Sequence, residues 1–451
     1  MRKRIRKQLS IVEPSVEHIH GRELQVIRGI ISSCPEILDM VHDDLIRGLR
    51  DPEAGRKGLM SAEQVFMVLL IKQMNGFSYD ELSFHLADSK TYRRFCGFGI
   101  ADDTPSESTI QRDVKKIRAE TLETIHRVIM SLAQGSGIEK GRKVRVDCTV
   151  VESNIHHPTD SSLLWDCVRV LCRIAQRAKE NHGIIVADHR RRAKKRSMGV
   201  LNAKNKTVRT NHYRDLLKVA RKVVFDAERV RAAVQALPTD NIVSKTTICC
   251  ELNHYIPLAR KVIEQTERRV LRGERLRPEE KLVSIFETHT DIIRKDNRDT
   301  YYGHKIVLCG GSSGLITDLV IEQGNPSDAI IAKKMVIRQQ DIFGKLPLQV
   351  AYDGGFASKD NLEKIKQLGV KDVAFAKKCG LKIDEMAKSF WVYKRLRNFR
   401  AGIEGMISFL KRCFGLARCT WRGFESFKAY AWSSVITANL LLMSRRIIAG
   451  C

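Results

Sequence analysis

The chain has 451 residues, of which 43% are hydrophobic and 29% charged, so it can bury a sizeable core and need not be disordered. This length favours two or three domains over one. Lysine and arginine total 79 against 52 acidic residues, and the net charge of +27 favours a polyanionic partner, nucleic acid before an anionic membrane surface.

The sequence predicts neither a secretion signal nor a membrane span. Residues 1–7 are basic but no apolar segment follows them. The longest apolar stretch, 429–443, is interrupted by polar residues and predicts a buried helix. The 12 cysteines are scattered without a Cys-x-x-Cys pair, as expected of reduced core residues in a cytosolic protein. A zinc site at Cys148, His156 and His157 stays an alternative.

Residues 1–60 have the pattern of a basic helical lead-in, and residues 61–135 that of a compact helical domain. Capping boxes that begin at Ser61 and Ser78 predict two helix starts in this domain, and Ser106 predicts a third. Short helices joined by Gly and Ser turns are typical of a helix-turn-helix reader of DNA. A plain helical bundle used for dimerisation stays an alternative.

The rest of the chain indicates a sheet interrupted by a long insertion. Apolar and polar residues alternate from Lys143 to Val150, which predicts a strand. Residues 161–285 are basic and helical, with helical runs at 212–236 and 246–273. The segments that follow are predicted as strands at 304–309, 315–321, 348–353 and 372–376, and as helices at 327–343, 359–368 and 395–413.

Without the insertion, this is the order of a ribonuclease-H-like α/β fold. We therefore expect a mixed-sheet catalytic core over residues 140–160 and 286–445. An N-terminal helical DNA-binding domain would precede this core, and the basic helical insertion, 161–285, would follow its first strand.

Two aspartates are candidates for the chemistry that cuts and joins phosphodiesters. Two divalent ions can activate the attacking oxygen and stabilise the leaving oxygen, and Mg²⁺ takes carboxylate ligands. Asp147 lies in the first core strand amid apolar neighbours, where an unpaired charge is costly. Asp353 ends a strand before two glycines, where ligands of open α/β sheets collect. Taken alone, each is more often a structural aspartate.

Glu404 is the third candidate and lies on the predicted helix 395–413, beside its apolar stripe. Arg400 and Lys411 lie within about 40° of it around the helix. An acid between two bases can face a metal while the bases contact phosphates. The alternative is an ordinary surface ion pair between Arg400 and Glu404.

This helix resembles that of the bacterial insertion-sequence DDE transposases, whose last catalytic helix carries Tyr-(2)-Arg-(3)-Glu-(6)-Lys. The matching residues are Arg397, Arg400, Glu404 and Lys411. Arg397 thus stands at the tyrosine position, which leaves the role of that tyrosine open here, and Tyr393 lies one helical turn earlier.

Other segments are similar to members of the same group. Asp353-Gly354-Gly355-Phe356 resembles its second motif, and Asp147 matches its first aspartate. The runs 286–291, 302–305 and 324–328 are also similar, so the resemblance spans about residues 60 to 445. The order of these motifs, on strand, strand and helix, makes the resemblance specific.

The resemblance implies a DNA transposase that cuts at the terminal inverted repeats of its element and joins the freed end to target DNA. Asp147, Asp353 and Glu404 would hold two Mg²⁺ or Mn²⁺ ions, and Arg400 and Lys411 would contact the element end. A homodimer in a synaptic complex is expected, because two ends are handled together. A non-catalytic DNA-binding protein and a ribonuclease-H-like nuclease without joining activity stay open as alternatives.

The spacing of the three acids fits this interpretation in part. The two aspartates are 206 positions apart, which fits an insertion after the first strand. Only 51 positions separate Asp353 from Glu404, which departs from members that carry a β-rich insertion there.

Further charged residues are interpreted more simply. His289 and His304 are expected to be neutral, hydrogen-bonded histidines of loops, and Asp328 an acid at a helix start. The basic run is expected to bind DNA phosphates, with a solvated face as the alternative. Its residues are Arg190, Arg191, Arg192, Lys194, Lys195 and Arg196.

Overall fold

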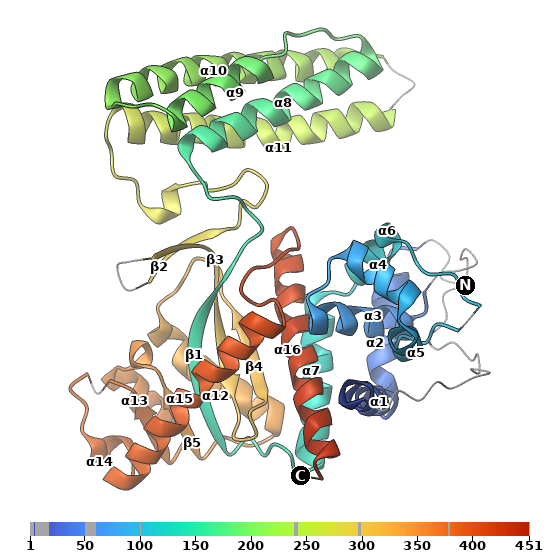
Figure 1. Ribbon diagram of the computed structural model, residues 1–451. Coiled ribbons are helices and arrows are strands. Elements are labelled where there is room, and N and C mark those ends of the chain that lie inside the picture. The colour runs from blue at the N-terminus through green and yellow to red at the C-terminus, as the bar shows by residue number, and fades with distance from the viewer. Residues whose placement is uncertain are drawn as a thin grey trace. The chain divides into compact units, whose positions relative to one another are not determined.

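The computed structural model describes residues 4, 18–49, 60–99, 101–238, 242–295, 299–377 and 379–450. It is a mixed α/β protein that divides into two compact units (Figure 1). The sheet unit comprises Met1–Ser153 and His304–Cys451, and the helical unit comprises Asn154–Gly303. The finer division into four parts that the sequence suggested stays a prediction.

Six strands form one mixed sheet in the order β2-β3-β1-β5-β6, with β4 paired to β3. β1 and β5 pair in parallel, as do β5 and β6, whereas β3 pairs antiparallel with both β2 and β4. The five predicted strands are confirmed, and β2 is the strand that the sequence pattern missed. The strands are β1 (Lys143–Glu152), β2 (Asp291–Lys295), β3 (Asp299–Gly310), β4 (Ile316–Ile321), β5 (Gln349–Tyr352) and β6 (Asp372–Phe375).

The alternation of side chains along β1 decides what each face of the strand meets. Val144 and Val146 are buried in an apolar cluster that also holds Ile331 and Met335. Lys143 and Arg145 point the other way, toward the ring of Phe399. Nζ of Lys143 lies 4.2 Å from the centroid of this ring, and Cζ of Arg145 lies 4.6 Å from it. Phe399 belongs to α15 (Phe390–Cys413), so the odd-numbered side chains of β1 face this helix.

Helices cover the sheet and build the N-terminal part of the same unit. The capping boxes at Ser61 and Ser78 both form, and Ser106 caps the helix that follows it, as predicted. The remaining helices of the sheet unit are α1 (Ile19–Ser32), α2 (Pro35–Ile46), α3 (Ala62–Asn75), α4 (Tyr79–Asp88), α5 (Lys90–Phe95), α6 (Glu107–Val114), α7 (Ala119–Gly135), α12 (Asp328–Phe343), α13 (Lys359–Gln367), α14 (Ile383–Met386) and α16 (Phe424–Ile448).

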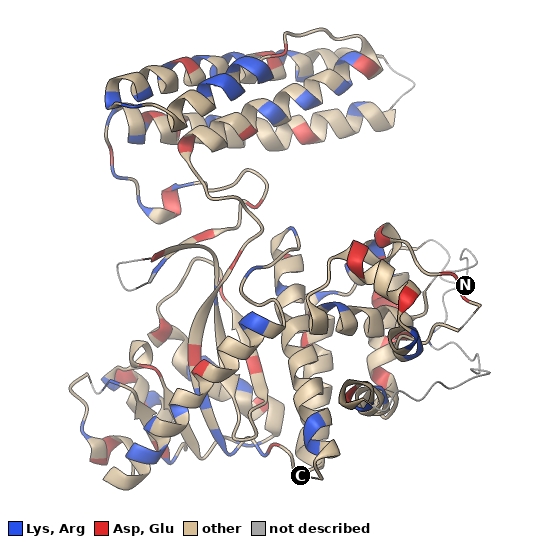
Figure 2. Ribbon diagram, viewed as in Figure 1, with Lys and Arg blue, Asp and Glu red and all other residues tan. Residues whose placement is uncertain are grey.

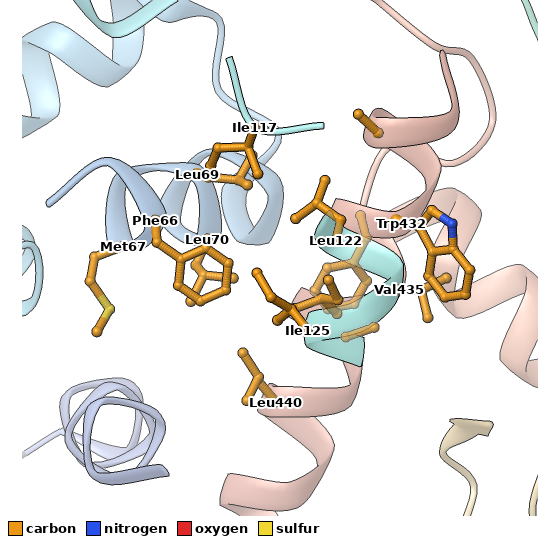
Figure 3. Close-up of a cluster of buried hydrophobic side chains, with 14 of the residues drawn as sticks. Phe66, Met67, Leu69, Leu70, Ile117, Leu122, Ile125, Trp432, Val435 and Leu440 are labelled. Carbon is orange, nitrogen blue, oxygen red and sulfur yellow. The ribbon is translucent and has the colours of Figure 1, made fainter. Parts of the chain in front are cut away.

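The C-terminal helix α16 lies in the core of the N-terminal helices. Figure 3 shows Trp432 and Val435 of α16 beside Leu122 and Ile125 of α7, with Phe66 of α3 across from them. The predicted buried helix at 429–443 is therefore confirmed, and part of its apolar surround comes from Phe66, Leu122 and Ile125, more than 300 positions before Val435. In the part of the chain that the structure describes, no helix is long and apolar enough to span a bilayer.

A buried polar group joins α16 to the sheet. The side chain of Asn439 accepts a hydrogen bond from the backbone N–H of Ile316 at 2.9 Å and donates one to its carbonyl at 2.8 Å. Nε2 of His126 on α7 lies 2.9 Å from the same carbonyl oxygen. These contacts tie the N-terminal helices, the C-terminal helix and β4 into one body.

The helical unit has an apolar core of its own, built by α8 (Asp160–His182), α9 (Arg190–Leu201), α10 (Lys206–Ala236) and α11 (Ile242–Thr266). The predicted pair of long helices is confirmed as α10 and α11, with earlier starts than the sequence pattern suggested. Leu216, Val230 and Ile256 are among the side chains that fill this core.

Candidate active site

The pairing of β1 with β5 brings two of the predicted acids together. Val146 lies opposite Tyr352 in the parallel register, and the next residue of each strand segment is Asp147 or Asp353. Both carboxylates therefore lie at the same end of neighbouring strands. Asp147 still belongs to β1, which continues to Glu152, whereas Asp353 directly follows β5.

Asp147 is almost completely buried, with 8% of its surface exposed. Burial raises the pKa of its carboxyl group because the charged form loses water. The positive charge of Arg400 and a backbone N–H lower this pKa, whereas the charge of Asp353 raises it further. That N–H belongs to Cys148 and donates to Oδ1 at 2.7 Å. The residue therefore needs a cation in its surroundings to carry its charge.

Asp353 is presented by a tight turn. It caps the single 3-10 turn Gly354–Phe356, and the buried ring of Phe356 packs on Tyr352 with 5.2 Å between ring centroids. A Cβ atom added at Gly355 would collide with the carboxylate of Asp328. The two glycines thus let the chain turn at a place where other side chains already fill the space.

Arg400 of α15 binds all three predicted acids. Its Nη2 lies 2.7 Å from Oδ2 of Asp147 and 2.9 Å from Oδ1 of Asp353, and its Nη1 lies 2.9 Å from Oε1 of Glu404. The two aspartate oxygens are thus at most 5.6 Å apart, the sum of their distances to Nη2. The structure brings together carboxylates from β1, from the end of β5 and from α15.

The exposure of these groups differs. The side chain of Arg400 is 16% exposed, that of Asp353 39% and that of Glu404 65%, so the cluster opens to solvent on the side of Glu404. Lys411, two helical turns beyond Glu404, is half-buried on the same helix. Arg397, at the tyrosine position of the resembling motif, is exposed.

Tyr393 anchors the start of α15 instead of lying free near the acids. Its ring is buried and its hydroxyl donates to the carbonyl of Phe375 on β6 at 3.0 Å. Closer to the acids, Gly402 lets α15 approach β1, because a Cβ there would overlap the guanidinium of Arg145. That guanidinium donates to the carbonyl of Phe399 at 2.9 Å, which fixes the helix above the strand.

A second ion pair lies beside the turn of Asp353 and was not predicted. Nζ of Lys305 on β3 lies 2.9 Å from Oδ1 of Asp328 and donates to the carbonyl of Pro326 at 2.7 Å. Asp328 stands in the first turn of α12, as its interpretation as a helix-start acid requires, yet its carboxylate also binds this lysine. The runs 302–305 and 324–328 contain these residues, but nothing in the sequence indicates that they pair.

The two histidines lie in different settings. His304 is a fully buried residue of β3, packed against the rings of Phe424 and Phe427 at 4.9 and 4.8 Å, so its expected place in a loop was wrong. Nε2 of His289 lies 2.8 Å from the carboxylate of Glu287.

The predicted basic run lies on α9 of the helical unit, and its six cations fall into two groups. Arg192 and Arg196 both pair with Asp215, and Arg190 pairs with Asp188. The other three, Arg191, Lys194 and Lys195, are exposed.

The donors at the carboxylate cluster fit a hard divalent cation. Asp147, Asp353 and Glu404 offer only oxygen atoms, which Mg²⁺ and Mn²⁺ prefer. Among the residues that the structure describes, no three Asp, Glu, His or Cys side chains form a ready group around a metal position. The guanidinium of Arg400 lies among the three carboxylates, so a divalent cation would compete with it for the same oxygens.

Comparison with known families agrees with this geometry. Residues 24–116 match a family model described as a transposase domain (DUF772), and residues 281–440 match the transposase DDE domain. The second match includes Asp353 and Glu404, while Asp147 precedes it. No curated protein and no solved structure was found to match. The two matched segments together assign this chain to the DDE transposases of insertion sequences.

Proposed function

We propose that this transposase hydrolyses phosphodiester bonds at the terminal inverted repeats of its element and transfers the freed 3′ ends to target DNA, with Asp147, Asp353 and Glu404 as ligands of two Mg²⁺ or Mn²⁺ ions. The observation that carries the proposal is the meeting of these three carboxylates at one guanidinium, although they are separated by 206 and 51 positions in the chain. Ions held there would supply activation of the attacking oxygen and stabilisation of the leaving oxygen.

The fold supports the same proposal. The sheet order and the helices after β4 and β5 agree with a ribonuclease-H-like core. In such a core, ligands gather at one end of neighbouring strands, which is where the chain carries Asp147 and Asp353. Glu404 would complete the set from α15, the helix that packs on both strands.

Arg400 has two roles in this proposal. Without metal, its guanidinium compensates three carboxylates that would otherwise repel one another. With the carboxylates engaged by divalent ions, the same guanidinium would be released toward a phosphate of the element end, which it can bind through two parallel hydrogen bonds. Lys411, further along the helix, would contact the same DNA strand as a point charge.

The N-terminal helices would read the terminal repeats. Residues 24–116, which match the transposase domain (DUF772), include the short capped helices α3, α4 and α6. Of these, α3 is buried whereas α4 and α6 expose side chains, so α4 and α6 suit insertion into a DNA groove. A homodimer would hold two element ends together. If these helices serve dimerisation instead, a variant altered in them would be monomeric and would still bind one element end.

A cleavage assay tests the proposal. The substrate is a duplex that contains the DNA flanking this gene at either side, with a labelled 3′ end and supercoiled plasmid as target. We expect nicking and plasmid insertion with Mg²⁺ or Mn²⁺, and neither with EDTA. Asp353→Asn should lower both rates by at least about a thousandfold, because one ligand of the ions is lost.

The matched control is Asp360→Asn, which removes an exposed acid of α13 that pairs only with its helix neighbour Lys364 in the described contacts. It should keep full activity. Cleavage without plasmid insertion would favour the nuclease alternative. Specific binding of the element end with no metal-dependent cleavage would favour the non-catalytic alternative, and full activity of Asp353→Asn would exclude the assigned site.

A further inference from the structure

The helical unit carries a strongly basic face. Residues 190–236, which form α9 and α10, contain 15 Lys and Arg and three Asp and Glu, a difference of +12 within a chain of net charge +27. Figure 2 shows blue segments along both helices. A charge excess this concentrated destabilises the unit by self-repulsion, so the segment is expected to have a polyanionic partner.

The three acids of this segment are already neutralised inside the unit. Asp215 accepts hydrogen bonds from Arg192 and Arg196, Asp226 pairs with Lys222 at 3.0 Å, and Glu228 pairs with Arg260 of α11. The pairs with Asp215 also fasten α9 to α10, so the two helices present their remaining cations on one rigid support.

The solvent face of α10 is almost entirely cationic. Between Tyr213 and Val230 the exposed residues lie 4, 3, 1, 3 and 4 positions apart, which places them on one helical face. There are six exposed residues on this face of α10, and five of them are basic. The sixth is Phe225, which is 54% exposed, and Nζ of Lys222 lies 5.2 Å from the centroid of its ring. The exposed residues are Arg214, Lys218, Arg221, Lys222, Phe225 and Arg229.

The neighbouring helix adds further exposed cations. Arg191, Lys194 and Lys195 are exposed on α9, and no ion pair joins them to an acid among the described residues. From Arg214 to Arg229 the α10 row alone spans about 22 Å, at about 1.5 Å per residue. This length covers about six base pairs of duplex DNA at about 3.4 Å each, so several successive phosphates are within its reach.

We propose that this face, termed the α9–α10 face, binds the phosphate backbone of duplex DNA without sequence preference, as a second DNA contact separate from the carboxylate site. Its cations are spread along two helices instead of gathered around one point, so they suit a repeating anion. A second copy of the chain would present the same positive charge and be repelled. The inference rests on the proposed function only in taking DNA as the polyanion.

The α9–α10 face makes a quantitative prediction about salt. The slope of log K against log salt concentration should become shallower by about 0.9 for every phosphate that a variant no longer neutralises. The test variant replaces four cations by glutamine, which keeps helix propensity. None of these four cations has an ion pair among the described residues. Its substitutions are Arg191→Gln, Lys194→Gln, Lys195→Gln and Lys218→Gln.

A second variant with the same reduction in charge serves as control. It replaces four exposed cations of the same unit that lie on α8, on α11 or after it, so a difference between the variants reports position instead of net charge. Its substitutions are Arg173→Gln, Lys179→Gln, Lys261→Gln and Arg275→Gln. Circular dichroism and the thermal midpoint show whether both variants remain folded.

The experiment measures binding of the full chain to a labelled 30-base-pair duplex of arbitrary sequence by fluorescence anisotropy, in EDTA and over a range of salt concentrations. We expect the test variant to bind about tenfold or more weakly, with a slope reduced by about 3 to 4, and the control variant to keep its slope within about one. Equal slopes for the two variants would overturn the proposal.

Two further arms decide the class of polyanion. Single-stranded RNA or vesicles rich in phosphatidylserine replace the duplex. If either binds more tightly than duplex DNA and loses that binding only in the test variant, DNA is the wrong partner and the proposal falls. No metal is present in this binding assay and no bond is cut, so Asp353→Asn should bind DNA like the unaltered chain. The binding assay therefore tests the α9–α10 face, and the cleavage assay tests the catalytic proposal.

Discussion

Nη2 of Arg400 lies 2.7 Å from Oδ2 of Asp147, although 253 positions separate the two residues, and the same nitrogen lies 2.9 Å from Asp353. One guanidinium thus takes the place among the carboxylates that a divalent cation would need. This relationship explains how a mostly buried aspartate keeps a counter-ion in the metal-free protein, and it predicts competition between Arg400 and metal.

Replacing Arg400 tests this competition. Arg400→Gln should lower the unfolding midpoint in EDTA, at a cost of about 2 kcal/mol, because Asp147 keeps a buried charge without its partner. Mg²⁺ or Mn²⁺ should then raise the midpoint more in the variant than in the unaltered chain. Differential scanning fluorimetry measures both shifts. Arg397→Gln, an exposed arginine of the same helix, is the control, and equal metal shifts in all three proteins would contradict the prediction.

Two glycines of α15 form a matched pair. Gly402→Ala should destabilise the protein by about 1 to 3 kcal/mol, because its Cβ overlaps the guanidinium of Arg145, which is held by Phe399. Gly405→Ala meets nothing within 4 Å and should stabilise by up to about 1 kcal/mol through helix propensity. Urea unfolding measures both, and equal effects would show that α15 does not approach β1 as described.

Lys72 of α3 gives a prediction with a defined pH window. The residue is 5% exposed, and burial lowers its pKa from the ordinary 10.5 to about 8. Between these values the unfolded chain binds a proton that the folded protein lacks, so this lysine makes stability rise with pH there. Below pH 8 the folded protein carries the buried charge, at a cost of about 3 kcal/mol.

Lys72→Met should therefore stabilise the protein at pH 7, and the gain should shrink as the pH rises from about 8 to 10.5. Denaturant unfolding of the variant and the unaltered chain at several pH values measures this difference. Lys90→Met, at an exposed lysine of α5, should change stability little at any pH. A gain at Lys72 that stays constant up to pH 10.5 would contradict the lowered pKa.

Asn439 tests the joint between α16 and the sheet. Asn439→Ala leaves the N–H and the carbonyl of Ile316 without their amide partner in a buried place, which should cost about 2 to 4 kcal/mol. Asn398→Ala, at an exposed position of α15, should change stability by less than about 0.5 kcal/mol. Thermal unfolding compares them, and a similar small destabilisation in both would mean that Asn439 does not hold β4.

Local sequence patterns predicted the local structure well. The alternation from Lys143 to Val150 predicted β1, and the capping boxes at Ser61 and Ser78 predicted two helix starts, because these signals depend on neighbours a few positions away. β2 was missed because its five residues, three of them charged, show no clear alternation. The start of α15 was placed five residues late, since the cap at Ser389 was not recognised.

Long-range packing was beyond the sequence pattern. Residues 429–443 predicted a buried helix, but apolar composition does not say that α3 and α7 surround it. The resemblance nominated Asp147, Asp353 and Glu404, yet it assigned Arg400 to DNA and gave no sign that one guanidinium binds all three acids. Pairs such as Lys305 with Asp328 depend on the sheet register, which a single sequence does not reveal.

The most direct test of the central claim is an anomalous diffraction measurement on crystals of the protein bound to an element-end duplex and Mn²⁺. We expect manganese peaks coordinated by the carboxylates of Asp147, Asp353 and Glu404, with the guanidinium of Arg400 turned away toward a phosphate. Manganese bound elsewhere while these carboxylates still hold Arg400 would contradict the assignment of the site.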